Sequence, residues 1–190
     1  MAVRMSGAER RAQVLSFAAA EFAAHGLYGA STDAIAHAAG ITQAYVFRMF
    51  GTKKALFLEL VGAAFEKFID GMREAAGDAT GLAALSSMGA QYYSLLADRT
   101  SLLLQLQGLA ACGDEEVRDA VRSCFARMWD TVADITGLAP VTVKSFLAFG
   151  MLLDAAAALD VDRIDQAWAA GMRTRINPGL FEHITAGTNR

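Results

Sequence analysis

Proline occurs only twice in this sequence of 190 residues, at Pro140 and Pro178. Because proline removes a backbone donor and clashes with the preceding helical turn, its scarcity allows long uninterrupted helices. Apolar residues make up 54% of the chain, and a chain of this length has enough of them to bury a core. We therefore predict an all-α protein in which Pro140 occupies the first turn of a helix, a position that tolerates proline.

Charge is distributed unevenly along the chain. The first 56 residues contain six Lys/Arg and three Asp/Glu, whereas the remainder contains eleven Lys/Arg and seventeen Asp/Glu. The net charge is −3, but attraction to phosphate depends on the local potential. An N-terminal segment that faces nucleic acid is therefore compatible with an acidic total.

Several classes of protein are disfavoured by the sequence. The longest apolar run, residues 146–159, contains Asp154 and is shorter than the roughly 18 to 20 residues that a membrane-spanning helix needs. No secretory signal follows the N-terminal arginines, so we expect a soluble, cytoplasmic protein with no membrane partner. Cys112 and Cys124 have no Cys-x-x-Cys spacing and no histidine cluster beside them, so we expect neither a disulfide nor a metal site.

The first 52 residues have the pattern of three helices. Val14, Ala18 and Phe22 recur at helical spacing, and His25-Gly26 ends this first pattern, because glycine adopts the conformation that closes a helix. Ser31 or Thr32 is an N-cap candidate for a short second helix that Gly40 ends. Thr42 then caps a third helix, with Val46 and Phe50 on its inner face. A long helix followed by two short helices that a glycine turn separates predicts a helix-turn-helix over residues 1–52.

The remaining residues, 53–190, are expected to form a second, helical domain. Leu56, Leu60, Ala64, Phe68 and Met72 continue one apolar row over several turns from Thr52, which predicts a connecting helix. Further helical patterns follow it, without repeats or low-complexity segments. The predicted fold is thus an N-terminal three-helix DNA-binding domain and a C-terminal helical domain for ligand binding and dimerisation.

Residues 32–56 read TDAIAHAAGITQAYVFRMFGTKKAL, and residues 11–22 read RAQVLSFAAAEF. Together they strongly resemble the N-terminal domain of the tetracycline-repressor (TetR) family of transcriptional regulators. The resemblance covers about the first 56 residues. It implies a homodimer that binds a palindromic double-stranded DNA operator, most often as a repressor, with the second short helix in the major groove. It also implies a small-molecule effector that releases the DNA, and the apolar composition of the second domain favours a hydrophobic or aromatic effector.

The DNA-binding candidates lie on and around the third helix. Gln43 and Tyr45 project from its exposed face and are predicted to read bases, because glutamine pairs with the N6 and N7 edge of adenine. Hydroxyl groups and a lysine at helix starts are predicted to contact phosphate. The family usually has a tyrosine at position 47 and histidines at positions 48 and 49; Arg48 replaces the lost phosphate contact in this interpretation. The full set is Thr32, Thr42, Gln43, Ala44, Tyr45, Phe47, Arg48 and Lys53.

The second domain offers two sets of candidates. Small-molecule sites combine apolar walls with a few polar groups, which favours an effector site lined by Met88, Tyr92, Tyr93, Gln105, Gln107, Phe125 and Trp129. The two glutamines are two positions apart on one helix, so they cannot both face one pocket. Dimerisation through the last two long helices is predicted at Phe146, Gly150, Leu153, Ala157, Trp168 and Gly171. Ordinary core packing predicts the same residues.

Two alternatives remain open at this point. The C-terminal domain could serve dimerisation or protein docking without a ligand, or the chain could be a helical enzyme or an interaction domain. The sequence contains no glycine-rich phosphate loop, and His25, His37 and His183 lie where helix ends or surfaces are expected. We therefore expect no catalytic residues and no cofactor, and we interpret the chain as a regulator.

Overall fold

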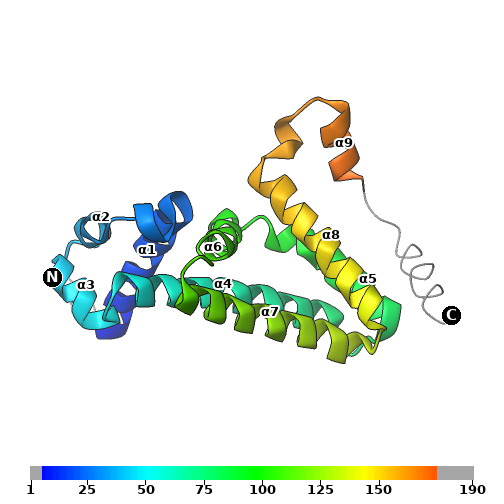
Figure 1. Ribbon diagram of the computed structural model, residues 1–190, viewed down its shortest axis with the longest axis horizontal. Coiled ribbons are helices and arrows are strands. Elements are labelled where there is room, and N and C mark those ends of the chain that lie inside the picture. Colours follow the sequence, from blue (N-terminus) through cyan, green and yellow to red (C-terminus); the bar gives the residue numbers. More distant parts are fainter. Residues whose placement is uncertain (1–5, 175–190) are drawn as a thin grey trace. The chain divides into compact units, whose positions relative to one another are not determined.

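The computed structural model describes residues 6–174, and Pro178 and His183 lie outside this range. The described residues form α-helices and one short 3-10 helix, with no strand, so the predicted all-α fold is confirmed (Figure 1). The helices are α1 (Gly7–Gly29), α2 (Thr32–Ala38), α3 (Gln43–Phe50), α4 (Lys53–Ala76), α5 (Gly81–Leu95), α6 (Arg99–Ala110), α7 (Glu115–Thr136), α8 (Pro140–Ala158), η1 (Val161–Arg163) and α9 (Ala167–Arg173).

Side-chain caps set the starts of the N-terminal helices. The Ser31 hydroxyl accepts a hydrogen bond from the Ala34 amide at 3.2 Å, so Ser31 caps α2. Thr42 accepts from the Tyr45 amide at the start of α3, and Thr52 accepts from the Ala55 amide at the start of α4. Each hydroxyl satisfies an amide that has no partner within its helix. As predicted, Pro140 lies in the first turn of α8.

Gly26 interrupts α1 near its end. Its backbone has φ +65° and ψ −176°, a conformation that is accessible essentially to glycine alone. The amide of Ala30 donates to the Gly26 carbonyl, which closes the chain before α2. The predicted break at His25-Gly26 therefore corresponds to a kink, after which helical structure resumes for one turn.

The described chain forms two compact units. Within residues 6–174, one unit comprises residues 6–65 together with Leu103–Ser123, and the other comprises Glu66–Leu102 together with residues 124–174. All of these boundaries fall within helices, so periodicity along the chain gives no sign of them. We call these the N-terminal unit and the C-terminal unit, and we describe each by itself.

Each unit has its own apolar core. In the N-terminal unit, Phe22 of α1 and Phe57 of α4 are completely buried, and their rings meet edge to face with centroids 5.2 Å apart. In the C-terminal unit, the buried cluster includes Ile69 and Met72 of α4 and Val132 of α7. Edge-to-face packing is a favoured arrangement of aromatic rings.

Helix α8 is long and apolar enough, by length and composition alone, to cross a membrane. Core helices of soluble proteins pass the same test. Thr142, Val143, Phe146 and Gly150 are buried within the C-terminal unit, whereas Met151 and Leu152 are exposed. The helix thus has an inner face that belongs to the core.

Candidate functional site

The turn between α2 and α3 is built around Gly40, whose φ is +64°. The Ile41 amide donates to the Ala36 carbonyl and the Gly40 amide to the His37 carbonyl. Ala39, which precedes the turn, is buried, and its small side chain allows the two helices to approach closely. Val46 and Phe50 anchor α3 to the core. The opposite face of α3, with Gln43, Ala44, Phe47 and Arg48, is exposed.

Two contacts organise the exposed face of α3. The side-chain amide of Gln43 donates a 2.6 Å hydrogen bond to the Thr32 hydroxyl, and Thr32 itself is only 7% exposed. The guanidinium of Arg48 lies over the ring of Tyr45, 4.5 Å from its centroid, a favourable cation–π arrangement. Two of the candidate DNA-binding side chains are therefore held in place by two others.

Other basic and hydroxyl candidates also have partners in the structure. The Lys53 ammonium donates to the carbonyls of Tyr28 and Ala30, at 3.3 and 3.1 Å. Thr42 is exposed and caps α3. Arg10, in contrast, donates to the Ala39 carbonyl at 3.2 Å and so braces the end of α2. The residues predicted to contact DNA thus lie on α3 or close to it. Two of them, Thr32 and Lys53, also form hydrogen bonds within the protein.

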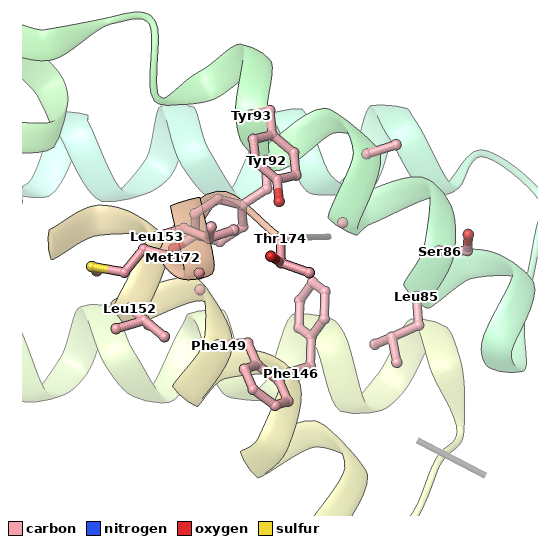
Figure 2. Close-up of a pocket in the computed structure, with 14 residues that line it drawn as sticks. Leu85, Ser86, Tyr92, Tyr93, Phe146, Phe149, Leu152, Leu153, Met172 and Thr174 are labelled. Atoms are coloured by element: carbon pink, nitrogen blue, oxygen red, sulfur yellow. The ribbon is translucent and has the colours of Figure 1, made fainter. Parts of the chain in front are cut away.

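A cavity of about 520 Å³ lies within the C-terminal unit, between α5, α8 and α9. Such volumes are typical of sites for small molecules. Aromatic and aliphatic side chains make most of its wall, and Figure 2 shows them around the open space. The lining residues are Leu85, Ser86, Gly89, Ala90, Tyr92, Tyr93, Phe146, Phe149, Gly150, Leu152, Leu153, Gly171, Met172 and Thr174.

Tyr92 connects the cavity to a half-buried carboxylate. Its hydroxyl donates to Asp154 of α8 at 2.8 Å, and its ring packs edge to face on Phe68, with centroids 4.6 Å apart. Burial raises the pKa of Asp154 to about 6, although the hydrogen bond from Tyr92 lowers it. Burial and the Asp154 charge raise the pKa of Tyr92 above its ordinary range. At neutral pH the phenol therefore stays protonated and donates to an ionised carboxylate.

Gly150 makes room for Tyr92. A Cβ placed on Gly150 would lie 2.7 Å from the Tyr92 hydroxyl oxygen, closer than van der Waals contact allows. The glycine therefore lets α5 and α8 approach at this point. Its small size thus serves packing within one chain, which is one of the two roles that the sequence left open.

The cavity contains only some of the residues predicted for an effector site. Tyr92 and Tyr93 line it, whereas Met88 is completely buried in the core, and Phe125 and Trp129 pack against that core. Gln105 and Gln107 lie in the N-terminal unit and outside the cavity, and their side-chain amides donate to the Ala64 and Ala23 carbonyls. These polar interruptions of an apolar helix satisfy backbone acceptors.

The predicted dimer residues divide into two groups. Phe146, Gly150, Leu153 and Gly171 line the cavity. Ala157 is half-buried, and Trp168 is 48% exposed. Exposed apolar side chains that the prediction did not include, Met151, Leu152 and Leu159, also occur on α8 and just after it.

Asp154 is the functional candidate that sequence reasoning missed. Its signal was present, because it is the charged residue that interrupts the apolar run 146–159. That interruption was used only as an argument against a membrane span. Buried charges are costly unless they have partners, so a carboxylate within an apolar helix marks a candidate site.

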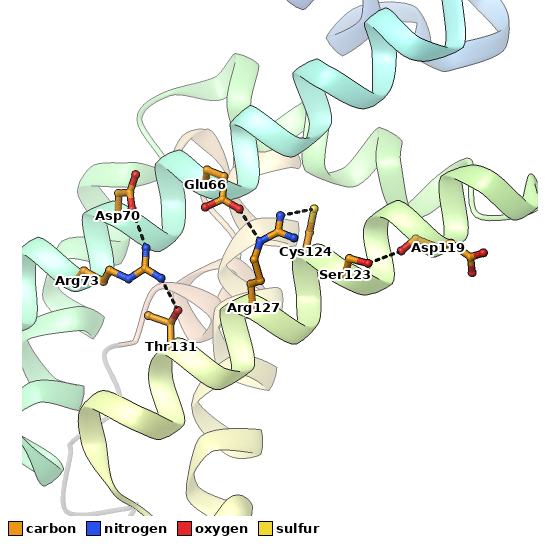
Figure 3. A network of polar contacts seen from close by, with 8 residues as sticks. All are labelled: Glu66, Asp70, Arg73, Asp119, Ser123, Cys124, Arg127 and Thr131. Carbon is orange, nitrogen blue, oxygen red and sulfur yellow. Dashed lines mark hydrogen bonds and ion pairs between the residues drawn. The ribbon is translucent and has the colours of Figure 1, made fainter.

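A second polar cluster joins α4 to α7 in the C-terminal unit (Figure 3). Arg127 donates to Glu66 at 2.7 Å and lies 3.4 Å from the Cys124 sulfur, and Arg73 donates to Asp70 and Thr131. Burial raises the pKa of the Cys124 thiol, which disfavours the reactive thiolate. Within residues 6–174, no group of three or more His, Cys, Asp or Glu could hold a metal ion.

Comparison with known proteins gives one match to a family model and several related folds. Residues 14–60 match the family described as "Bacterial regulatory proteins, tetR family". No curated protein matches the sequence.

Solved structures with the same fold include a transcriptional regulator from Pseudomonas aeruginosa, with 19% identity, a TM-score of 0.68, and coverage of 97% of this chain and 94% of that one. A TetR-like regulator from Rhodococcus sp. RHA1 has 22% identity, a TM-score of 0.64, and coverage of 97% and 100%. FadR from Bacillus subtilis, solved in complex with stearoyl-CoA, has 16% identity, a TM-score of 0.68, and coverage of 94% and 100%.

Proposed function

We propose that this chain, whose residues 14–60 match the TetR family of bacterial regulatory proteins, represses transcription as an effector-controlled homodimer. In this proposal α3 enters the major groove of a palindromic operator, and a small molecule in the cavity of the C-terminal unit releases the DNA. The protein acts in the cytoplasm and catalyses no reaction.

The exposed face of α3 is the observation that carries the proposal. Gln43 and Tyr45 are assigned to base reading, and the Arg48 guanidinium lies beside them on the Tyr45 ring. Helix α3 has eight residues, two buried side chains anchor it, and a glycine turn precedes it. This is the geometry by which helix-turn-helix proteins reach base edges. Phosphate contacts from Arg48 and the Thr42 hydroxyl would set its register.

Homodimerisation is supported by apolar side chains exposed on α8 and α9. Met151 and Leu152 are each 48% exposed, as is Trp168. Adjacent exposed apolar residues on a soluble protein mark interaction surfaces. Because a two-fold dimer places its two reading helices symmetrically, the operator would be an inverted repeat.

Control by an effector is supported by the cavity in the C-terminal unit. It combines apolar walls with the hydroxyls of Tyr92 and Tyr93, the composition expected of a small-molecule site. FadR, which shares the fold, holds stearoyl-CoA in its solved structure. The predicted hydrophobic or aromatic effector is consistent with these walls.

Selection from a pool of random double-stranded DNA tests the proposal directly. The purified full chain is incubated with the pool near physiological salt, where non-specific phosphate binding is weak. Enrichment of an inverted repeat is the expected result, and light scattering of the selected complex would give two protomers per site. Recovery of unrelated sequences, at the level given by a Gln43→Ala/Tyr45→Ala variant, would contradict sequence-specific regulation.

A further inference from the structure

The polar side chains in the wall of the C-terminal cavity indicate which class of ligand it can bind. The polar side chains in its wall are Ser86, Tyr92, Tyr93 and Thr174, and the lining includes no Lys, Arg or His. The Thr174 hydroxyl already donates to the Ala170 carbonyl at 3.2 Å. The described wall therefore contains no cation that would bind a carboxylate or phosphate.

Tyr92 presents a hydrogen-bond acceptor to this cavity. A phenol has one proton, and that of Tyr92 is directed to Asp154, 2.8 Å away. The lone pairs of its oxygen remain, and the adjacent carboxylate makes the oxygen a stronger acceptor, because hydrogen bonds in series polarise one another. The complementary ligand group is consequently a donor.

Asp154 gives the same end of the cavity a negative charge. Helix α5, which packs against α8 at this point, contains no charged residue. Lys144, the one basic residue of α8, is exposed and lies ten positions before Asp154. Arg99 donates to the Ala157 and Ala158 carbonyls at the end of α8, and Arg173 donates to the Val161 and Ile164 carbonyls. Within the described residues, only the Tyr92 hydroxyl bonds to the carboxylate.

We propose that this cavity binds a small amphipathic cation, an apolar molecule with one amine or ammonium group. The charged group lies at the Tyr92 hydroxyl, within the field of Asp154, and the apolar part lies against Phe146 and Phe149. Aromatic faces also attract cations, and a charge in a site of low dielectric interacts more strongly than in water. This inference deepens the proposed function and rests on it for the regulatory role of the site.

Matched amphiphiles with one alkyl chain isolate the effect of charge. Isothermal titration calorimetry of the full chain at pH 7.5 compares four compounds, each below its micellar concentration: decylamine, decyltrimethylammonium, decanol and decanoate. Decylamine is expected to bind at least tenfold more tightly than decanoate, and decanol with an affinity between those two. Decyltrimethylammonium, which has the charge but no N–H donor, is expected to bind more weakly than decylamine. Equal or tighter binding of decanoate, or no binding of decylamine, would overturn the proposal.

Variants then locate the charge. Asp154→Asn retains the size of the side chain and an acceptor for Tyr92, so cation affinity should fall about tenfold while decanol affinity changes less than twofold. Asp134→Asn removes the same charge from an exposed position on α7 and should change neither. An Asp154→Asn protein that is folded by circular dichroism and binds both cations like the parent would contradict the assignment.

The titration contains no DNA, so its result is independent of the proposed function. Cation binding together with failed operator selection would support the ligand class and remove the regulatory role. Decanoate binding together with an enriched inverted repeat would overturn the ligand class and leave the regulator intact. Sedimentation of the parent with and without decylamine tests whether a second protomer occupies the cavity. An unchanged dimer at saturation supports a small ligand as the occupant, whereas loss of the dimer would overturn that assignment, because the two would then compete.

Discussion

The side-chain amide of Gln43 and the buried hydroxyl of Thr32 are 2.6 Å apart, and their hydrogen bond joins α3 to α2. Thr32 was predicted from the sequence to contact phosphate. The hydrogen bond supports a further hypothesis, that Thr32 positions Gln43, because the bond fixes the orientation of an amide that would otherwise rotate freely. In the proposed contact with adenine, Gln43 would use its second amide proton and its amide oxygen.

Replacing Thr32 with valine tests this positioning role. Thr32→Val keeps the shape of the buried side chain and removes the hydroxyl, and one hydrogen bond contributes about 1 kcal/mol. We expect affinity for the selected operator to fall several-fold, with no change for random DNA in the same titration. Thr32→Ser should restore discrimination, whereas an equal loss on both DNAs would return Thr32 to the phosphate role.

Arg48 is predicted to bind phosphate while it stacks on Tyr45. Arg48→Ala should weaken binding to operator and random DNA alike and lower the slope of log affinity against log salt by about one. Fluorescence anisotropy at four salt concentrations gives that slope, with Arg122→Ala, an exposed arginine of α7, as the matched control. A loss confined to the operator would make Arg48 a base reader.

The close approach of Gly150 to Tyr92 predicts opposite effects of two glycine substitutions. An added Cβ would lie 2.7 Å from the Tyr92 hydroxyl oxygen at Gly150 but 3.7 Å from Phe146, an ordinary contact, at Gly89. Overpacking costs about 1 to 3 kcal/mol, whereas alanine favours a helix by up to about 1 kcal/mol over glycine. Urea denaturation should show Gly150→Ala destabilised and Gly89→Ala equal to or more stable than the parent.

Asp154 should make the protein less stable as the pH rises through the weakly acidic range. The pKa of its folded form is about 6, above that of an unfolded aspartate, so the folded state holds the proton more tightly. The contribution of Asp154 to the free energy of unfolding is therefore fully present below about pH 4. It is lost as the pH rises to about 6, and above that pH it no longer changes. A shift of this size corresponds to at most about 3 kcal/mol.

Comparison of Asp154→Asn with the parent by urea denaturation from pH 4 to 8 isolates this contribution, since the variant lacks the titrating group. Asp98 titrates in the opposite sense. Burial opposes the shift, but hydrogen bonds from Lys67 and Ser101 lower the pKa of Asp98 to about 2, so its contribution decreases only in stronger acid. A parent and variant with parallel stability curves between pH 4 and 6 would refute the assignment to Asp154.

The features that sequence predicted well depend on local chemistry. A hydroxyl one residue before a helix and a glycine after it act within a single turn, so Ser31, Thr42 and Gly40 could be interpreted from neighbouring residues alone. The cavity depends on how α5, α8 and α9 pack, and Gly150 could equally have served contact within or between chains. Gln105 and Gln107 were assigned to a ligand because the carbonyls they bond, at Ala64 and Ala23, are distant in the sequence.

The N-terminal unit is built from two separate segments of the sequence, which has a consequence for protein engineering. Residues 103–123 belong to the same compact unit as α1, α2 and α3, and Lys54 pairs with Asp114 and Glu116 inside it. A chimera joined at residue 52 would thus transplant α3 without its support, and substitutions in a segment far from the helix-turn-helix would emerge from a genetic screen as operator-binding defects. Exchange of specificity between regulators of this kind requires that two separate gene segments move together.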